Sequence, residues 1–420
     1  MYNKYSLVGI NTKYVHSNLA IRYIKKYCDK KNIIISNIEY SINDNIDKIL
    51  KGIRKEKSNV LGFSCYIWNI ELILKICNSL KKILPSSTII LGGPEVSYDS
   101  EKIMRENPSI DFIVCEEGEK TFYKLIKYLE DKTIDIQSIE GLSYRLGDEI
   151  KSNKKREPIR NLDIIPFPYR NLKELKNKII YYETSRGCPF ECQYCLSSIE
   201  KGVRYFSLER VYEDIDFFID NNVKQVKLVD RTFNCHQERC IRIMDYIIKK
   251  GGNTNFHLEI SSKLISSEFL SLVEKAPRRL FQFEIGIQTT NPHTLKAIKR
   301  KEPFEDIKEN ISKLLDLNVG HIHLDLIAGL PYEDLDSFKN SFDQAYSLQP
   351  DMLQLGFLKL LKGSGLRKKA AKYGIRYHSH SPYEVISTND LSYNDIITLK
   401  GVEDLLEKYY NSGRFKKSLS

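Results

Sequence analysis

Three cysteines, Cys188, Cys192 and Cys195, are the residues of this 420-residue chain whose type and spacing most directly indicate chemistry. They lie within the run Thr184-Ser-Arg-Gly-Cys-Pro-Phe-Glu-Cys-Gln-Tyr-Cys-Leu196. Thiolates gathered on one loop can bind one metal centre, and sulfur ligands select iron–sulfur clusters, zinc or copper(I). A structural zinc site needs four ligands, whereas the next cysteine along the chain is Cys235 and no histidine lies nearby. The spacing therefore favours an iron–sulfur cluster in which one iron is left open.

Two other interpretations of these cysteines stay open. The three thiols could be buried as small apolar side chains, or they could form a zinc site with a distant fourth ligand. The segment is polar, however, with Gly187, Pro189, Glu191 and Gln193 interspersed among the cysteines. Such a composition is typical of a loop and not of the apolar stretches that bury inert cysteine. We therefore interpret the three thiols as ligands.

The pattern CxxxCxΦC, with Tyr194 as its aromatic residue, follows a predicted strand at residues 178–184 and resembles the radical S-adenosylmethionine (SAM) superfamily. The resemblance implies that Cys188, Cys192 and Cys195 hold a [4Fe-4S] cluster. The open iron would be chelated by the amino and carboxylate groups of SAM, and reductive cleavage of SAM would give a 5′-deoxyadenosyl radical. It also implies an electron donor such as flavodoxin or ferredoxin, and a place for Tyr194 near the SAM adenine.

Length and composition set the frame for this site. A chain of 420 residues is too long for one core, so we expect two domains and an appendage. No apolar run approaches the ~20 residues of a membrane span, and the chain does not start like a secretion signal. An odd number of cysteines also favours a reducing compartment, so we predict a cytoplasmic protein. The net charge is +10, but lysines alternate with acidic residues, which argues against a nucleic-acid partner.

Residues 1–140 alternate short β-branched runs with longer amphipathic ones, which predicts a Rossmann-like (flavodoxin-like) parallel sheet with helices on both faces. Ligands bind such sheets at the carboxyl ends of the strands. The predicted strands are 5–10, 33–39, 60–64, 88–92 and 112–115, and the predicted helices are 18–27, 46–54, 70–84, 100–107 and 119–130.

Two glycines, Gly92 and Gly93, end one of these strands, and Ser64 ends another. A glycine there lets a ligand approach the backbone, although a tight turn would use the same residues. Together with the run from Ile113 to Phe122, they resemble the cobalamin-binding domain that precedes many radical SAM domains. The resemblance implies that Ser64, Gly92 and Gly93 contact cobalamin.

One motif of cobalamin-binding domains is missing. Mutases and methionine synthase carry DxHxxG after the first strand, and its histidine ligates cobalt, but here residues 11–18 read Asn-Thr-Lys-Tyr-Val-His-Ser-Asn. Many radical SAM relatives also lack this motif, so its absence does not exclude cobalamin. His16 could be a ligand, a substrate contact or a residue of a helix start, and we favour the last.

The remaining chain contains a proline-bearing segment at 141–177, which we interpret as a linker, and a second βα series at 178–366. The series predicts a parallel sheet of about six strands, which by resemblance curls into a partial (βα)6 TIM-type barrel. Residues 367–420 form an expected helical extension, and relatives often continue further, so we expect a shortened chain or a reduced C-terminal domain. The predicted barrel strands are 178–184, 225–229, 255–259, 282–287, 321–326 and 352–358.

Polar residues or glycines stand at the ends of the predicted barrel strands, on the face where a barrel exposes its active site. The resemblance places them near SAM, although each could equally cap a strand end. The candidate SAM contacts are Asp230, Asn234, Glu259, Gln288 and Gly329.

The predicted activity is that of a cobalamin-dependent radical SAM enzyme, with methyl transfer to an unactivated centre as its outcome. A small-molecule, peptide or lipid-like substrate would fit, and the sequence does not identify it. Alternatives are a radical rearrangement, an RNA-modifying methylthiotransferase and a non-catalytic metal-binding regulatory module. The methylthiotransferase would need three further cysteine ligands in the first domain, where Cys28, Cys65 and Cys115 are present without that family's surroundings.

Overall fold

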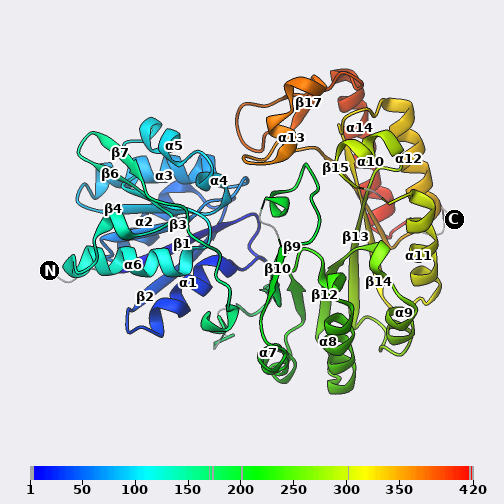
Figure 1. Ribbon diagram of the computed structural model, residues 1–420, viewed down its shortest axis with the longest axis horizontal. Helices are drawn as coiled ribbons and strands as arrows, with labels where there is room; N and C mark the ends of the chain where they lie inside the picture. The colour runs from blue at the N-terminus through cyan, green and yellow to red at the C-terminus, as the bar shows by residue number, and fades with distance from the viewer. Residues whose placement is uncertain are drawn as a thin grey trace. The chain divides into compact units, whose positions relative to one another are not determined.

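The computed structural model describes residues 4–169, 171–172, 175–199, 202–300, 302–415 and 418. The chain divides into two compact units, Met1–Tyr181 and Tyr182–Ser420 (Figure 1). Each unit contains one large sheet, and the chain alternates between strands and helices in both. The predicted α/β class is therefore confirmed.

The sheet of the first unit has seven strands in the order β2-β1-β3-β4-β5-β6-β7. The pairs from β2 to β5 are parallel, as the βαβ alternation predicts. The predicted boundaries of these five strands agree with the structure to within two residues. The strands are β1 (Tyr5–Asn11), β2 (Ile35–Ser41), β3 (Val60–Ser64), β4 (Thr88–Gly92) and β5 (Phe112–Val114).

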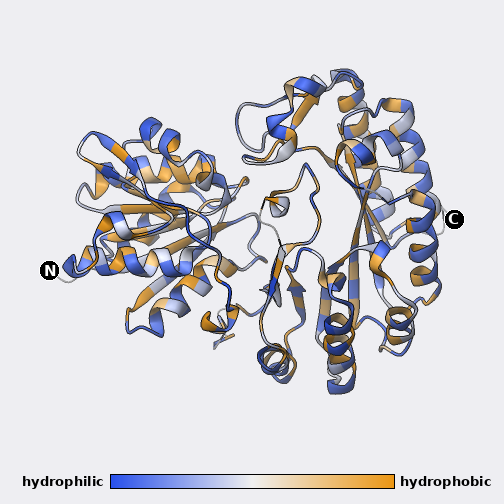
Figure 2. Ribbon diagram, viewed as in Figure 1, coloured by the Kyte–Doolittle hydropathy of each residue, from blue (hydrophilic) through white to orange (hydrophobic). Residues whose placement is uncertain are grey.

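Helices cover both faces of this sheet because its strands alternate apolar side chains between two cores. Ile10, Phe63 and Leu91 belong to one core, whereas Leu7 and Ile90 belong to the other. Figure 2 shows apolar residues along the strands and mixed polarity along the helices. The helices are α1 (Leu19–Asp29), α2 (Ile46–Lys55), α3 (Ile70–Ile83), α4 (Pro94–Ser97), α5 (Ser100–Glu106) and α6 (Gly118–Asp131).

The predicted linker at 141–177 differs from the structure. Its first part forms β6 (Leu142–Leu146) and β7 (Glu149–Ser152), an antiparallel pair added to the sheet beyond β5. β7 is polar and largely exposed, as edge strands commonly are, so its sequence lacks the β-branched run that marks the buried strands. The segment belongs to the first unit, and Arg170, Lys173 and Glu174 lie outside the described residues.

A six-stranded sheet in the order β15-β14-β13-β12-β11-β8 forms the second unit, and its strand β8 begins two residues before the boundary at Tyr182. The pairs from β11 to β15 are parallel, and the order is that of an open, partial barrel. The strands are β8 (Ile180–Tyr182), β11 (Gln225–Leu228), β12 (Asn255–Ile260), β13 (Phe281–Gln288), β14 (His321–Ala328) and β15 (Met352–Phe357). The helices between them are α7 (Leu208–Asp220), α8 (Gln237–Lys250), α9 (Ser267–Glu274), α10 (Pro292–Ala297), α11 (Phe304–Asp316) and α12 (Leu335–Ser347).

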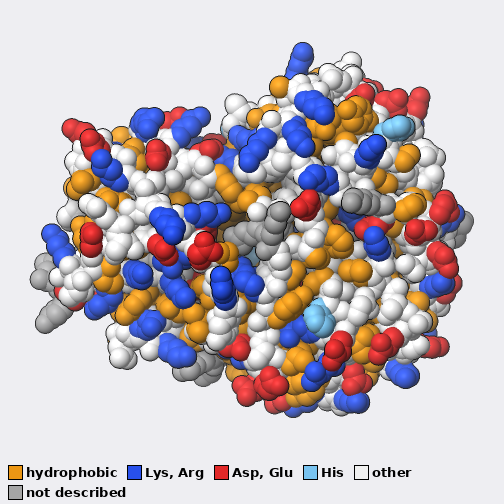
Figure 3. Space-filling model, viewed as in Figure 1, with side chains coloured by type: hydrophobic (Ala, Val, Ile, Leu, Met, Phe, Trp, Pro, Cys, Tyr) orange, Lys and Arg blue, Asp and Glu red, His pale blue; other side chains and the backbone are white. Residues whose placement is uncertain are grey.

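The C-terminal extension is only partly helical. Between α13 (Gly365–Lys368) and α14 (Tyr393–Leu405), it contains a two-stranded antiparallel sheet of β16 (Arg376–Tyr377) and β17 (Val385–Ser387). The last helix continues as a π-helical turn over Leu406–Asn411. In the described chain, no helix combines the length and apolarity needed to cross a bilayer. On the face shown in Figure 3, Lys and Arg side chains are interspersed with Asp and Glu.

Candidate functional site

A cavity of about 950 Å³ in the second unit brings the three cysteines together with residues from several barrel strands. Cys188, Cys192 and Cys195 line one wall, next to Tyr194. Glu259 at the end of β12 and Gln288 at the end of β13 also line the cavity. Six of the predicted site residues therefore share one pocket at the carboxyl ends of the strands.

The cysteine loop lies between β9 (Ser185–Cys188) and β10 (Gly202–Tyr205), which pair as an antiparallel hairpin. Gly187 has φ +101, and a Cβ there would lie 2.2 Å from the carbonyl oxygen of Gly202, so the hairpin needs glycine at this position. Further along the loop, the Gln193 N–H donates to the Ile298 carbonyl at 3.0 Å, and its own carbonyl accepts from Leu366 N–H at 2.8 Å. These bonds fix the loop against two other elements of the barrel.

The surroundings of the three sulfurs suit an iron–sulfur cluster. The Cys195 Sγ accepts from the Ser197 N–H at 3.4 Å, and the Cys188 Sγ lies 3.6 Å from the Thr232 hydroxyl. Burial raises the pKa of the Cys192 thiol, so ligation there would displace a proton. Among the described residues, no three His, Cys, Asp or Glu side chains are close enough to hold a single metal ion. A cluster needs no such convergence, because each thiolate binds a different iron.

Tyr194 has a partner that the sequence does not reveal. The Arg300 guanidinium donates to the Tyr194 hydroxyl at 3.3 Å and pairs with Glu302 at 3.6 Å. Burial is the main reason that the pKa of Tyr194 is raised, so its ring stays neutral. Arg300 also lines the cavity and places a positive charge beside Cys192.

Glu259 and Glu284, which line the cavity, belong to a row of ionisable side chains on neighbouring strands. The Lys227 Nζ on β11 lies 2.7 Å from the Glu284 carboxylate on β13 and 3.8 Å from that of Glu259 on β12. Although burial opposes ionisation, His257 and Lys227 lower the pKa of Glu284 to about 2. Burial raises the pKa of Glu259 despite Lys227. The cavity is thus lined by two neighbouring carboxyl groups whose pKa values are shifted in opposite directions.

Three predicted SAM contacts do not line this cavity. Asp230 is 1% exposed and accepts hydrogen bonds from the Thr184 N–H and hydroxyl and from the Ser185 hydroxyl, so it braces the start of the cysteine hairpin. Asn234 is fully buried and bonds both backbone groups of Ser261. Gly329 has φ +89, and a Cβ there would lie 2.7 Å from Val385 of β17. The contacts of these three residues in the structure are therefore to other parts of the protein.

The first unit has a smaller cavity of about 90 Å³, and it is lined by all three predicted cobalamin contacts, Ser64, Gly92 and Gly93. Its other lining residues are mostly apolar and come from α1, α6 and strands β1 and β3 to β5. Gly93 has φ +115, and a Cβ there would lie 2.5 Å from the carbonyl oxygen of Cys65. Glycine at this position therefore lets two strand-end loops approach closely.

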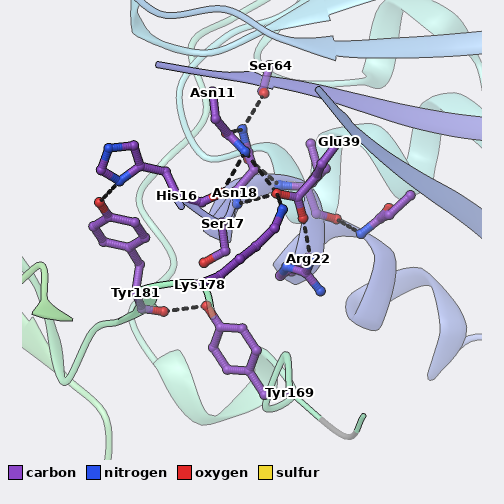
Figure 4. Close-up of polar contacts among 12 residues, drawn as sticks. Asn11, His16, Ser17, Asn18, Arg22, Glu39, Ser64, Tyr169, Lys178 and Tyr181 are labelled. Atoms are coloured by element: carbon purple, nitrogen blue, oxygen red, sulfur yellow. Dashed lines mark hydrogen bonds and ion pairs between the residues drawn. The ribbon is translucent and has the colours of Figure 1, made fainter. Parts of the chain in front are cut away.

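His16 and Ser17 belong to a network of polar contacts that extends to Ser64, as Figure 4 shows. The His16 Nδ1 lies 2.6 Å from the Tyr181 hydroxyl, and the Ser17 hydroxyl donates to the Ile179 carbonyl at 2.8 Å. The helix start predicted near His16 is present, but its capping residue is Asn18.

The cysteines that a methylthiotransferase would require do not form a ligand set. Cys28 and Cys65 are fully buried and belong to the two different cores of the sheet. Burial raises the pKa of Cys28 to about 12 and also raises that of the Cys115 thiol. These are the properties of inert structural thiols.

Comparison with protein families agrees with this division of the chain. The model of the B12 binding domain matches residues 5–126, and the model of the radical SAM superfamily matches residues 182–345. A third model, of a protein family of unknown function, matches residues 371–420.

Two relatives are methyltransferases by name. The chain is 27% identical over 319 residues to an uncharacterized methyltransferase of Pyrococcus horikoshii, covering 73% of this chain and 68% of that protein. It is 24% identical over 341 residues to the cobalamin-dependent radical SAM methyltransferase TokK of Streptomyces tokunonensis, covering 76% of this chain and 50% of TokK. The match thus spans 68% of the first relative and half of the second.

Two solved structures share the fold. The radical SAM methyltransferase TsrM of Kitasatospora setae, with cobalamin and a [4Fe-4S] cluster bound, matches with a TM-score of 0.73 at 14% identity, over 90% of this chain and 81% of TsrM. The cobalamin-dependent radical enzyme OxsB matches with a TM-score of 0.70 at 18% identity, over 96% of this chain and 62% of OxsB. Residues 182–345 therefore form a radical SAM domain, and a B12-binding-like domain precedes it at residues 5–126.

Proposed function

We propose that the chain is a cobalamin-dependent radical SAM methyltransferase, which uses a [4Fe-4S] cluster and SAM to methylate an unactivated centre. The observation that carries the proposal is the shared cavity of about 950 Å³, in which the three cysteines face polar groups at the barrel's strand ends. The order of the two matched domains and the names of the relatives support the same activity.

In this proposal, Cys188, Cys192 and Cys195 ligate the cluster. Bound there, the cluster would supply the electron for the reductive cleavage of SAM, and cobalamin would supply the methyl group. The chain's own residues bind and orient these groups. Tyr194, held by Arg300, offers a neutral ring for the SAM adenine, and Glu259 and Gln288 offer polar groups to its ribose and methionine part.

Asp230, Asn234 and Gly329 enter the proposal as positioning residues. Asp230 fixes Thr184 and Ser185 directly before the cysteine loop, so its loss would move the cluster ligands without removing a SAM contact. Asn234 bonds the backbone just after β12, which carries Glu259. Precise placement of reactive groups by such surrounding bonds has a large effect on rate.

The first unit supplies the proposed cobalamin site, with Ser64, Gly92 and Gly93 in contact with the cofactor. A cavity of about 90 Å³ accommodates only one ring-sized part of cobalamin, and its apolar lining suits an aromatic group of the cofactor. The glycines leave the backbone open to the ligand at the carboxyl edge of the sheet, where doubly wound folds bind their ligands.

The proposed location is the cytoplasm, and the proposed electron donor is a flavodoxin or ferredoxin. A small-molecule, peptide or lipid-like substrate is compatible with the cavity. The interspersed charges on the face in Figure 3 do not favour a nucleic-acid substrate.

Product analysis tests the proposal. Anaerobically reconstituted protein with SAM, cobalamin and a reductant should form 5′-deoxyadenosine, and with a methyl acceptor it should also form S-adenosylhomocysteine. Formation of 5′-deoxyadenosine alone, with candidate acceptors rearranged and not methylated, would replace methyl transfer by a radical rearrangement. No cleavage of SAM by cluster-loaded protein would leave the metal-binding regulatory module as the better account.

A further inference from the structure

The hydroxyl of Ser64 is held in one orientation by a neighbouring amide. It is 7% exposed, lines the cavity of the first unit, and accepts a hydrogen bond from the Asn18 Nδ2 at 2.9 Å (Figure 4). Asn18 itself is 5% exposed. Gly9 of β1 lies next to Ser64 in the sheet, and a Cβ at Gly9 would lie 3.0 Å from the Asn18 Nδ2. The absence of a side chain at Gly9 therefore makes room for this amide.

The direction of the Asn18 amide follows from a second bond. Its Oδ1 caps helix α1 by accepting from the Ile21 N–H at 3.2 Å. With the oxygen committed to the helix, the NH₂ group must face Asn11 and Ser64, where it lies 3.4 Å from the Asn11 Oδ1. The helix cap therefore determines that Ser64 receives a proton donor and not an acceptor.

A serine hydroxyl has one proton, and because Asn18 donates to the oxygen, the Ser64 proton must point elsewhere. In the described part of the chain, no acceptor for that proton is found. Since the Ser64 side chain borders the cavity, the available direction is into it.

Glu39 keeps Asn18 in place. One oxygen of its carboxylate accepts from the Asn18 N–H at 3.1 Å and from the Asn11 Nδ2 at 2.9 Å, and the other pairs with Arg22. The Glu39 side chain is 8% exposed, and the Lys178 Nζ lies 3.6 Å from it. Bonds to a buried carboxylate are stronger than bonds between neutral groups, so this network resists rearrangement when a ligand enters.

We propose that Asn18 is a positioning residue that directs the Ser64 proton into the cavity, so that Ser64 donates to a hydrogen-bond acceptor of cobalamin. The inference rests on the proposed cobalamin site. It adds that this site selects for an acceptor at that point of the ligand, and that the selection is set by the cap of helix α1.

Hydroxocobalamin binding to the full chain, followed by its absorption spectrum, tests the inference. Asn18→Ser keeps a good helix cap but removes the amide, and Asn18→Asp keeps the shape and the cap but offers Ser64 an acceptor. We expect each variant to lower the affinity for hydroxocobalamin about tenfold, as expected for one hydrogen bond. Thermal unfolding of each variant shows whether it folds, and one folded variant is sufficient for the test.

Ser64→Ala separates positioning from a general structural effect. If Asn18 acts through Ser64, Asn18→Ser should cost little further affinity once Ser64 is alanine. Folded Asn18 variants that bind as tightly as the unmodified protein, or that lose the same affinity in the Ser64→Ala background, would overturn the inference. Failure of the unmodified chain to bind hydroxocobalamin would instead remove the cobalamin site itself, and the inference with it.

Discussion

The two cavities of this molecule lie in similar places on similar sheets, yet they differ in chemistry. The barrel cavity, of about 950 Å³, is lined by three thiols and several ionisable side chains. The cavity of the first unit, of about 90 Å³, is lined mainly by glycines and aliphatic groups, with Ser64 and Glu116 among its few polar residues. The barrel cavity suits the proposed electron transfer and bond cleavage. The cavity of the first unit suits the binding of a ligand by shape.

The largest expected effect comes from the cysteine loop. Cys192→Ala should reduce cluster iron and 5′-deoxyadenosine formation to background, because two thiolates hold a [4Fe-4S] cluster poorly. The measurement is iron, sulfide and product analysis after anaerobic reconstitution.

Cys235→Ala is the matched control, since Cys235 lies near the same hairpin, 3.4 Å from the Tyr205 hydroxyl, but does not line the cavity. Equal loss in both variants would show that the cavity lining does not define the cluster site.

The next largest effect concerns the shape of the smaller cavity. Gly93→Ala combines a φ of +115 with a Cβ only 2.5 Å from a carbonyl oxygen, so it should destabilise the chain by about 2 kcal/mol or more and abolish tight hydroxocobalamin binding. Gly147→Ala provides the control, because its φ is +60 but nothing lies within 4 Å of the added Cβ. Similar losses of cobalamin affinity in the two variants would mean that the close approach at Gly93 is irrelevant to binding.

The carboxyl groups of the barrel cavity predict a pH effect on stability. Because the folded pKa of Glu284 is about 2, below the ordinary value of 4.5, its ionisation stabilises the fold above pH 4.5, and this contribution is lost as the pH falls towards 2. Glu284→Gln should therefore cost about 2 kcal/mol at pH 7 and progressively less below pH 4.5, as followed by thermal unfolding.

Glu259→Gln is the control of opposite sign. The raised pKa of Glu259 means that its ionisation costs stability as the pH rises, so this variant should be neutral or more stable at pH 7. Destabilisation of the same size by both substitutions would contradict the assigned pairing of Lys227 with Glu284.

The smallest expected effect concerns the hydrogen bond between Tyr181 and His16. Tyr181→Phe removes the hydrogen bond with the His16 Nδ1 but keeps the ring contact, and it should destabilise the first unit by about 1 kcal/mol, with cluster iron unchanged. Hydrogen exchange of residues 11–18 is a direct measurement. Unchanged exchange rates there would show that this hydrogen bond does not hold residues 11–18 in place.

Much of this architecture could be predicted from the sequence, because the periodicity of apolar residues and the turn residues at strand ends are local signals. The strands Val60–Ser64 and Thr88–Gly92 were predicted to the residue, and the cysteine motif located the larger cavity. β6 and β7 were missed because the exposed, polar β7 lacks an apolar run.

The side-chain partners within the site could not be predicted from local sequence patterns. Arg300 reaches Tyr194 across 106 positions of the chain, and Lys227 reaches Glu284 across 57, so only the folded sheet reveals either pair. Asp230 and Asn234 show the same limit of local sequence patterns. Their strand-end positions were recognised, but the sequence could not tell a ligand contact from a bond to the backbone.

The most direct test of the two-cavity account is the metal content of the full chain after anaerobic reconstitution with iron, sulfide and hydroxocobalamin. The account predicts about four iron atoms and about one cobalt per chain, with iron lost in Cys192→Ala and cobalt lost in Gly93→Ala. Loss of both metals together in either folded variant, or about four iron atoms with no cobalt under any condition, would contradict the assignment of one cofactor to each cavity.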